Sequence, residues 1–134
     1  MSYATRSDVE LAFGKDNIVK WADLDNLQNP TTIAARIEWA LLNSYTLLNA
    51  KLINGHYTVP FSEPYPQLII YAQSLWAGQM LFDGRMVTDA NKRDQISFQR
   101  AELRNLVKQI HRGQSKLEGV DLAGTNIPIA VIEE

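Results

Sequence analysis

The chain has 134 residues, of which 46% are hydrophobic and 21% charged, and its formal net charge is −2. This balance is typical of a globular domain, and a chain of this length buries enough surface to fold without a disulfide or a metal. Cysteine is absent, which excludes a disulfide framework, a thiolate nucleophile and a cysteine-based zinc site.

Two short helices are expected at the start of the chain. Thr5 and Asp8 have the spacing of a capping box, and Gly14 marks the end of the first helix. Residues 15–23 then predict a second short helical turn, which the polar sequence DLDNLQN interrupts.

A long amphipathic helix follows. Asn29 and Pro30 are typical of an N-cap and a first-turn proline, and the pattern continues until Gly55. The positions expected on the buried side recur at three- and four-residue steps: Ile33, Ile37, Ala40, Leu41, Ser44, Tyr45, Leu48 and Leu52.

The next helix is expected to follow Pro66 and to end near Gly84. It is apolar nearly all round, which is typical of the central helix of a bundle. Ala77 and Gly78 lie at its middle and would let a neighbouring helix approach closely.

The stretch NGHYTVPFSEPYPQL, residues 54–68, separates these two helices. Its prolines favour an extended backbone. The side chains of Tyr57, Phe61 and Tyr65 either fold back over the bundle or offer aromatic anchors to another chain. The functional hypothesis is the second of these alternatives, a partner-binding loop.

A last long helix is expected after the polar loop 85–93, with its stop at Gly113. Its inward positions are Ile96, Leu103, Leu106, Val107 and Ile110.

Charge is distributed unevenly along the chain. The segment from Lys92 to Lys116 contains seven basic and two acidic residues, so it carries +5 and the remainder −7. Four of these basic residues stand four positions apart and form one row along a helix, which we call the basic row: Arg100, Arg104, Lys108 and Arg112. Like charges at this spacing repel, and only Glu102 lies nearby to offset them, so external negative charge would stabilise the row. The row is either a solvated face, a contact for an acidic protein partner or a contact for the backbone of a nucleic acid, without base-specific readout.

The tail contains an apolar run, IPIAVI, in which Pro128 permits at best an edge strand. Ile127, Ile129 and Val131 of this run either pack on the body of the chain or bind a neighbour as an added strand.

Patterns of catalysis and metal binding are sparse. His56 and His111 have no second histidine or carboxylate at helical ligand spacing, which indicates a loop histidine and a helix-end histidine. Asp23 and Asp25 lie in a turn, where carboxylates usually accept hydrogen bonds from backbone N–H groups. No phosphate-binding loop, nucleophile elbow or dinucleotide fingerprint occurs. We therefore expect no catalytic residues, no metal and no cofactor.

No membrane association is expected either. The longest apolar-rich window, residues 68–82, is too short to cross a bilayer, and the first ten residues lack the apolar run of a secretion signal. We expect a soluble protein made inside the cell.

The order of these features resembles a known family. Four stretches are similar to the small Mu-type phage protein family, which is similar in turn to the head–tail adaptor (connector, head-completion) proteins of tailed phages. They are YATRSDVELAFGKDNIVKWAD, ALLNSYTLLNAKLINGHYTVPFSEPYPQL, IIYAQSLWAGQML and FQRAELRNLVKQIHRGQSKL. The resemblance covers residues 3 to about 117 and divides the chain into an adaptor-like domain, 1–117, and a C-terminal extension, 118–134. His56 stands where the family normally has a basic residue before the tyrosine, so a cation there is weaker or pH-dependent.

The resemblance implies a structural protein and not an enzyme. Its copies would form a homo-oligomeric ring between the portal and the tail of a phage or prophage, with portal and tail-completion proteins as partners. The resemblance also implies possible non-specific contact with DNA in the lumen of the ring. The protein would be located in the virion and, during assembly, in the host cytoplasm. The alternative function is a small helical DNA-binding protein that uses the basic row.

The residues themselves predict a mainly α fold. We expect a small bundle of four to five helices with an extended proline- and aromatic-rich loop and an irregular or edge-strand C-terminal tail.

Overall fold

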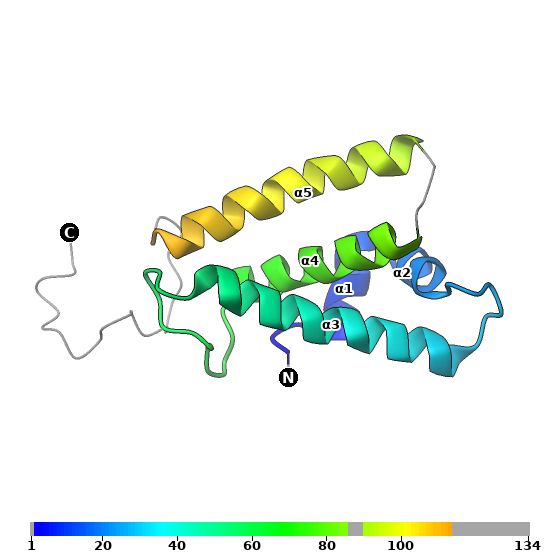
Figure 1. Ribbon diagram of the computed structural model, residues 1–134, viewed down its shortest axis with the longest axis horizontal. Helices are drawn as coiled ribbons and strands as arrows, with labels where there is room; N and C mark the ends of the chain where they lie inside the picture. Colours follow the sequence, from blue (N-terminus) through cyan, green and yellow to red (C-terminus); the bar gives the residue numbers. More distant parts are fainter. Residues whose placement is uncertain (1, 86–89, 114–134) are drawn as a thin grey trace, which may run out of the picture.

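The computed structural model describes residues 2–85 and 90–113, the side chains of residues 90–92 excepted. Within these ranges the chain forms five helices and no strand (Figure 1). The helices are α1 (Arg6–Phe13), α2 (Lys15–Ala22), α3 (Pro30–Leu52), α4 (Gln67–Arg85) and α5 (Ala90–His111). The expected small helical bundle is confirmed. No helix in the described ranges has both the length and the hydrophobicity that crossing a lipid bilayer requires.

The starts of α1 and α3 are fixed by local capping, as the sequence predicts. The backbone N–H of Thr5 donates to the Asp8 carboxylate at 2.8 Å, and the Asp8 N–H donates to the Thr5 hydroxyl at 3.3 Å. At α3 the Asn29 side chain accepts a hydrogen bond from the Thr31 N–H at 3.0 Å, and Pro30 occupies the first turn. These contacts satisfy N–H groups that the helices leave unpaired.

α5 begins earlier than the sequence suggests. Residues 85–93 read as a polar loop, yet the helix starts at Ala90. Its first turn is polar and therefore lacks the apolar periodicity by which a buried helix is recognised.

α4 is the central helix of the bundle. It contacts each of the other helices, whereas α5 packs only on α3 and α4 within the described ranges. In Figure 1 α3 and α5 lie on either side of α4. The buried apolar residues of α4 point in nearly every direction, which confirms the expectation of a central helix: Ile69, Ala72, Leu75, Ala77, Leu81 and Phe82.

Gly78 allows α1 to pack closely against α4. A side-chain carbon at this position would overlap the ring of Phe13. The Phe13 ring in turn packs edge-on against Trp21, and Trp21 against Phe82, with ring centres 5.7 and 5.1 Å apart. The close approach that the sequence predicted at Gly78 is therefore present.

Replacing Gly78 with alanine should lower the free energy of unfolding by about 1 kcal/mol, measured by urea denaturation. Overpacking against Phe13 costs about 1–3 kcal/mol, which exceeds the gain of about 1 kcal/mol in helix propensity. The matched control is Gly84→Ala, where the added carbon would meet only the flexible end of Arg36. That variant should be as stable as the original chain or slightly more stable. A Gly78→Ala variant at least as stable as the Gly84→Ala variant would contradict the close packing.

The N-terminal segment is held to the bundle by Gln73, whose side chain is fully buried in α4. Its Oε1 accepts hydrogen bonds from the backbone N–H groups of Tyr3 at 2.7 Å and Ala4 at 2.8 Å. Its Nε2 donates to the Leu41 carbonyl at 2.9 Å and to the Ser2 hydroxyl at 2.7 Å. One amide therefore joins the first residues of the chain to both α3 and α4.

The loop 54–68 folds back over the bundle. Tyr57 and Phe61 are only 5% and 6% exposed, and Tyr65 is half-buried against the core. The ring of Tyr3 covers this loop, with its centre 5.5 Å from that of Phe61 and 5.0 Å from that of Tyr65. This placement corrects the hypothesis that Tyr57 and Phe61 are anchors for another chain, because their side chains already fill the core.

The hydroxyl group of Tyr3 completes this contact. It donates to the Asn49 side chain at 2.6 Å and accepts from the backbone N–H of Phe61 at 3.0 Å. Burial raises the pKa of Tyr3 to about 12. The folded chain therefore holds this proton more tightly than the unfolded chain, in which the pKa is 10.0.

A Tyr3→Phe variant should show a stability difference that depends on pH. Since the pKa is raised on folding, the contribution of the Tyr3 hydroxyl is complete below pH 10 and is lost as the pH rises through about 12. At pH 8 the variant should be less stable by about 1–3 kcal/mol, because the Phe61 N–H loses its partner. Urea unfolding at pH 8, 10 and 11 should show this difference shrinking at the two higher values. A difference of constant size would be inconsistent with the raised pKa.

Candidate interaction surfaces

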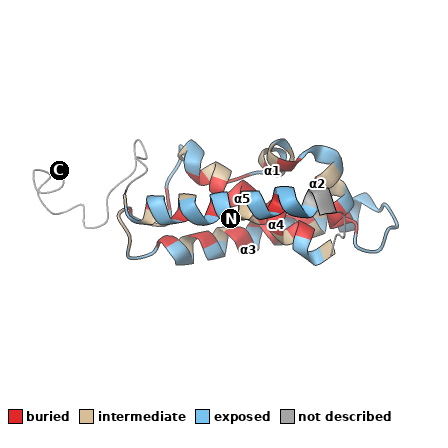
Figure 2. Cartoon of the chain, turned by 90° about the horizontal axis from the view of Figure 1, so that it is seen from above, coloured by how far each residue is buried: buried red, intermediate tan, exposed pale blue. Residues whose placement is uncertain are grey.

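α3 carries an apolar surface on the side opposite to its buried residues. The residues on this side recur at three- and four-residue steps, and none of them is charged. Trp39, Leu42 and Ile53 are 43%, 53% and 57% exposed. We call this surface the outer face of α3, and it comprises Ala35, Trp39, Leu42, Thr46, Ala50 and Ile53. In Figure 2 buried and exposed residues alternate along α3. An exposed, mainly apolar surface of this kind is typical of a contact with another macromolecule.

The outer face of α3 borders a shallow hollow near the start of the helix. The hollow has a volume of about 350 Å³, and Leu24, Ala35 and Trp39 are among the residues that line it. The guanidinium carbon of Arg36 lies 4.0 Å from the centre of the Trp39 ring. This cation–π contact holds the exposed indole in place beside the hollow.

The basic row lies along a groove between α5, α4 and the end of α3. The groove has a volume of about 700 Å³, and we call it the cationic groove. Its floor is apolar and consists of Trp76, Leu103 and Val107. Lys51 of α3 adds a cation from the opposite side. The other cations that line the groove are Arg100, Arg104, Lys108 and Arg112, and Gln79 and His111 complete the lining.

Arg100 differs from the rest of the basic row. Its guanidinium donates two hydrogen bonds to the Asp83 carboxylate of α4, at 2.8 and 3.0 Å. The hydrogen bond to Asp83 also raises the pKa of Arg100. The expectation that only Glu102 offsets the row is therefore wrong for Arg100. Among the described residues no ion pair forms at Arg104, Lys108, Arg112 or Lys51, and the first three are exposed.

Gln79 contributes an unpaired donor to the cationic groove. The residue is 4% exposed, and its Nε2 group has no hydrogen-bond partner in the part of the chain that the structure describes. A buried amide without a partner costs about 1–3 kcal/mol, so an acceptor bound in the groove would be stabilising.

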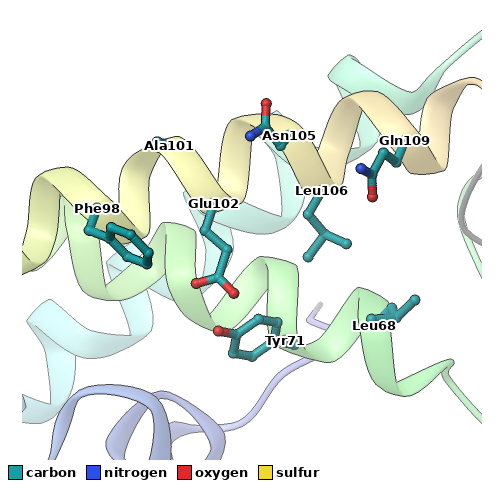
Figure 3. Close-up of a pocket in the computed structure, with 8 residues that line it drawn as sticks. All are labelled: Leu68, Tyr71, Phe98, Ala101, Glu102, Asn105, Leu106 and Gln109. Carbon is teal, nitrogen blue, oxygen red and sulfur yellow. The ribbon is translucent and has the colours of Figure 1, made fainter.

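A second groove lies on the other side of α5 and has a volume of about 500 Å³. Figure 3 shows the Glu102 carboxylate of α5 pointing toward the Tyr71 hydroxyl of α4, between Phe98 and Leu106. Burial, the charge of Glu102 and a hydrogen bond to it raise the pKa of Tyr71. Glu102 thus faces away from the cationic groove and does not neutralise it.

The backbone of the two histidines and the carboxylates of the turn aspartates form structural hydrogen bonds in the described residues. The His56 backbone N–H donates to the His111 carbonyl at 2.8 Å, which joins the loop to the end of α5. The Asp23 carboxylate accepts from the Gln28 N–H at 3.2 Å, and the Asp25 carboxylate accepts from a backbone N–H two residues further on at 3.1 Å. The predicted backbone contacts of the aspartates are confirmed. Within residues 2–85 and 90–113 no three histidines or carboxylates are arranged to hold a metal ion.

Ile127, Ile129 and Val131 lie outside the described residues, as does the expected boundary between residues 117 and 118. The groove residues that could not be recognised from the sequence come from other elements than α5. Gln79, Trp76 and Lys51 enter the cationic groove from α4 and α3, and no local pattern marks them. The outer face of α3 did leave a signal, since Trp39, Leu42 and Ile53 repeat at helical spacing opposite the buried residues.

Comparisons of the chain with known protein families, with curated proteins and with solved structures find no match.

Proposed function

We propose that this chain is a structural assembly protein, a head–tail adaptor of a phage or prophage that forms a ring between portal and tail. The observation that carries the assembly role is the uncharged, exposed outer face of α3. The order of sequence features over residues 3 to about 117 supports the phage origin. The protein would then act in the virion, after assembly in the host cytoplasm.

The outer face of α3 has side chains that suit a protein contact. From Ala35 to Ile53, the residue that directly follows α3, it covers nineteen residues, or about 27 Å along the helix axis. Exposed Trp39 and Leu42 supply the large apolar side chains that contribute most to interface energies, and the hollow beside Trp39 would receive a side chain from a partner.

The proposed contact surface thus differs from the one that the sequence suggested. The loop 54–68 supports the bundle through Tyr57 and Phe61, and α3 takes its place as the surface for a neighbouring copy or the portal protein.

Mixing the purified full chain with portal protein tests this proposal. Negative-stain microscopy should show portal rings with an added layer of density, and sedimentation should show the two proteins moving together. A monomer in isolation is compatible with the proposal, because the portal would act as the template for the ring. Absence of the chain from every connector preparation would refute the adaptor role.

The second candidate is a small DNA-binding protein, which the exposed cations of the basic row favour. Retention on duplex DNA should then fall with salt and be lost in an Arg104→Gln/Lys108→Gln variant. A Lys15→Gln/Lys20→Gln variant removes the same charge from α2 and is the matched control. Lack of retention at low salt would exclude this function. The apolar floor of the cationic groove favours a protein partner over a phosphate backbone.

A further inference from the structure

We propose that the cationic groove binds the chain's own C-terminal segment, residues 117–134. The inference does not depend on the adaptor role, because it concerns a contact within one chain. It is carried by the chemistry of the groove, the charge of the segment and the place where α5 ends.

The lining of the cationic groove defines what it can bind. Trp76, Leu103 and Val107 form an apolar floor, and the exposed cations stand at its edge. The unpaired Nε2 group of Gln79 requires an acceptor such as a backbone carbonyl or a carboxylate. This combination suits a peptide with apolar side chains and carboxylates, since the phosphates of a nucleic acid would leave the apolar floor uncovered.

Residues 117–134 have this composition. They contain four acidic residues and no lysine or arginine, so their net charge is −4. The apolar run IPIAVI is followed directly by Glu133 and Glu134, which would bring carboxylates beside the cations once the run covers the floor. The carboxylates would also relieve the repulsion between Arg104, Lys108 and Arg112, which stand four residues apart.

The chain leaves α5 beside the groove. The helix ends at His111, and both His111 and Arg112 line the groove. The backbone turns at Gly113, where φ is +75° and glycine is favoured. From Arg112 to Arg100 the groove follows about 18 Å of helix, whereas the thirteen residues 114–126 can span up to about 43 Å when extended. The apolar run therefore reaches the whole groove within one chain.

Binding within one chain needs little intrinsic affinity. A segment tethered by a short connection has an effective concentration in the millimolar range. Ion pairs at exposed positions contribute less than about 1 kcal/mol each, so several pairs and the apolar floor would have to act together.

A spin label tests the proposal on the full chain. The sequence has no cysteine, so Asn126→Cys accepts a single nitroxide beside the apolar run without altering it. The chain has three tryptophans, whose indole N–H signals are resolved by ¹⁵N NMR. Trp76 lies in the groove, and Trp39 lies on the outer face of α3 as an internal control. We expect the oxidised label to remove at least half of the Trp76 signal and to leave the Trp39 signal nearly unchanged.

Charge reversal provides the matched variants. Arg104→Glu/Lys108→Glu should restore the Trp76 signal, and adding Glu133→Lys/Glu134→Lys to that variant should remove it again. Reversal of two lysines on α2, Lys15→Glu/Lys20→Glu, should have no effect. Rescue by the double reversal separates a direct contact from a general change in the fold.

Four outcomes would overturn the proposal. The first is an unchanged Trp76 signal at low salt, and the second is equal loss at Trp39. The third is loss in a mixture of ¹⁵N-labelled and spin-labelled chains, because the segment would then come from a second copy. The fourth is a Trp76 signal that responds to added duplex DNA and not to the label, which would make the groove a nucleic-acid site.

Discussion

Replacing Gln73 with methionine should lower the free energy of unfolding by about 4 kcal/mol. Methionine nearly matches glutamine in volume, so the packing of α4 is largely kept while the polar contacts are lost. The backbone N–H groups of Tyr3 and Ala4 would remain buried without an acceptor, and each such group costs about 1–3 kcal/mol. Urea or thermal unfolding of the full chain measures the loss.

The same substitution at Gln67 is the control, because Gln67 is exposed in the first turn of α4. It should change the free energy of unfolding by less than about 0.5 kcal/mol. A loss below about 1 kcal/mol for Gln73→Met would mean that the N-terminal segment does not depend on this amide. Local release of Ser2 to Ala4 in a variant that remains folded would appear as faster amide exchange there.

Placing a charge on the outer face of α3 should strongly weaken assembly and leave the fold intact. A Leu42→Glu variant would bury an unpaired carboxylate in the proposed contact, at a cost of about 3–5 kcal/mol. Association with portal protein should therefore weaken at least 100-fold, as measured by sedimentation of the mixed proteins. The side chain of Leu42 is 53% exposed, so the stability of the free chain should change little.

Leu11→Glu is the matched control for this experiment. Leu11 is 85% exposed on α1 and is not part of the outer face of α3, so the same change of side chain should leave assembly unaffected. Equal weakening by the two variants would indicate a general effect of charge. Unchanged assembly of the Leu42→Glu variant would place the contact on another surface.

Features encoded by neighbouring residues could be predicted from the sequence. The capping box of Thr5 and Asp8 and the cap formed by Asn29 depend on groups within three residues, and both are present. The all-round hydrophobicity of α4 correctly indicated the central helix, because a helix buried on every side has no polar face to show. The basic row was visible because a helix places every fourth residue on one side.

Features that join distant residues could not be predicted. Gln73 meets partners about 70 residues away, and nothing in its neighbourhood distinguishes it from an exposed glutamine. The aromatic loop looked free because Tyr3, which covers it, lies more than fifty residues earlier in the chain. Likewise the Arg100–Asp83 pair and the floor of the cationic groove depend on how α5 packs on α4.

Photo-crosslinking from position 42 tests most directly whether the outer face of α3 is the assembly contact. A benzophenone side chain in place of Leu42 should form covalent adducts with a neighbouring copy or with portal protein in the assembled complex, and the same group at Leu11 should form none. Mass spectrometry of the adducts identifies the partner residue. Complexes that assemble normally and yield no adduct from position 42 would contradict the account.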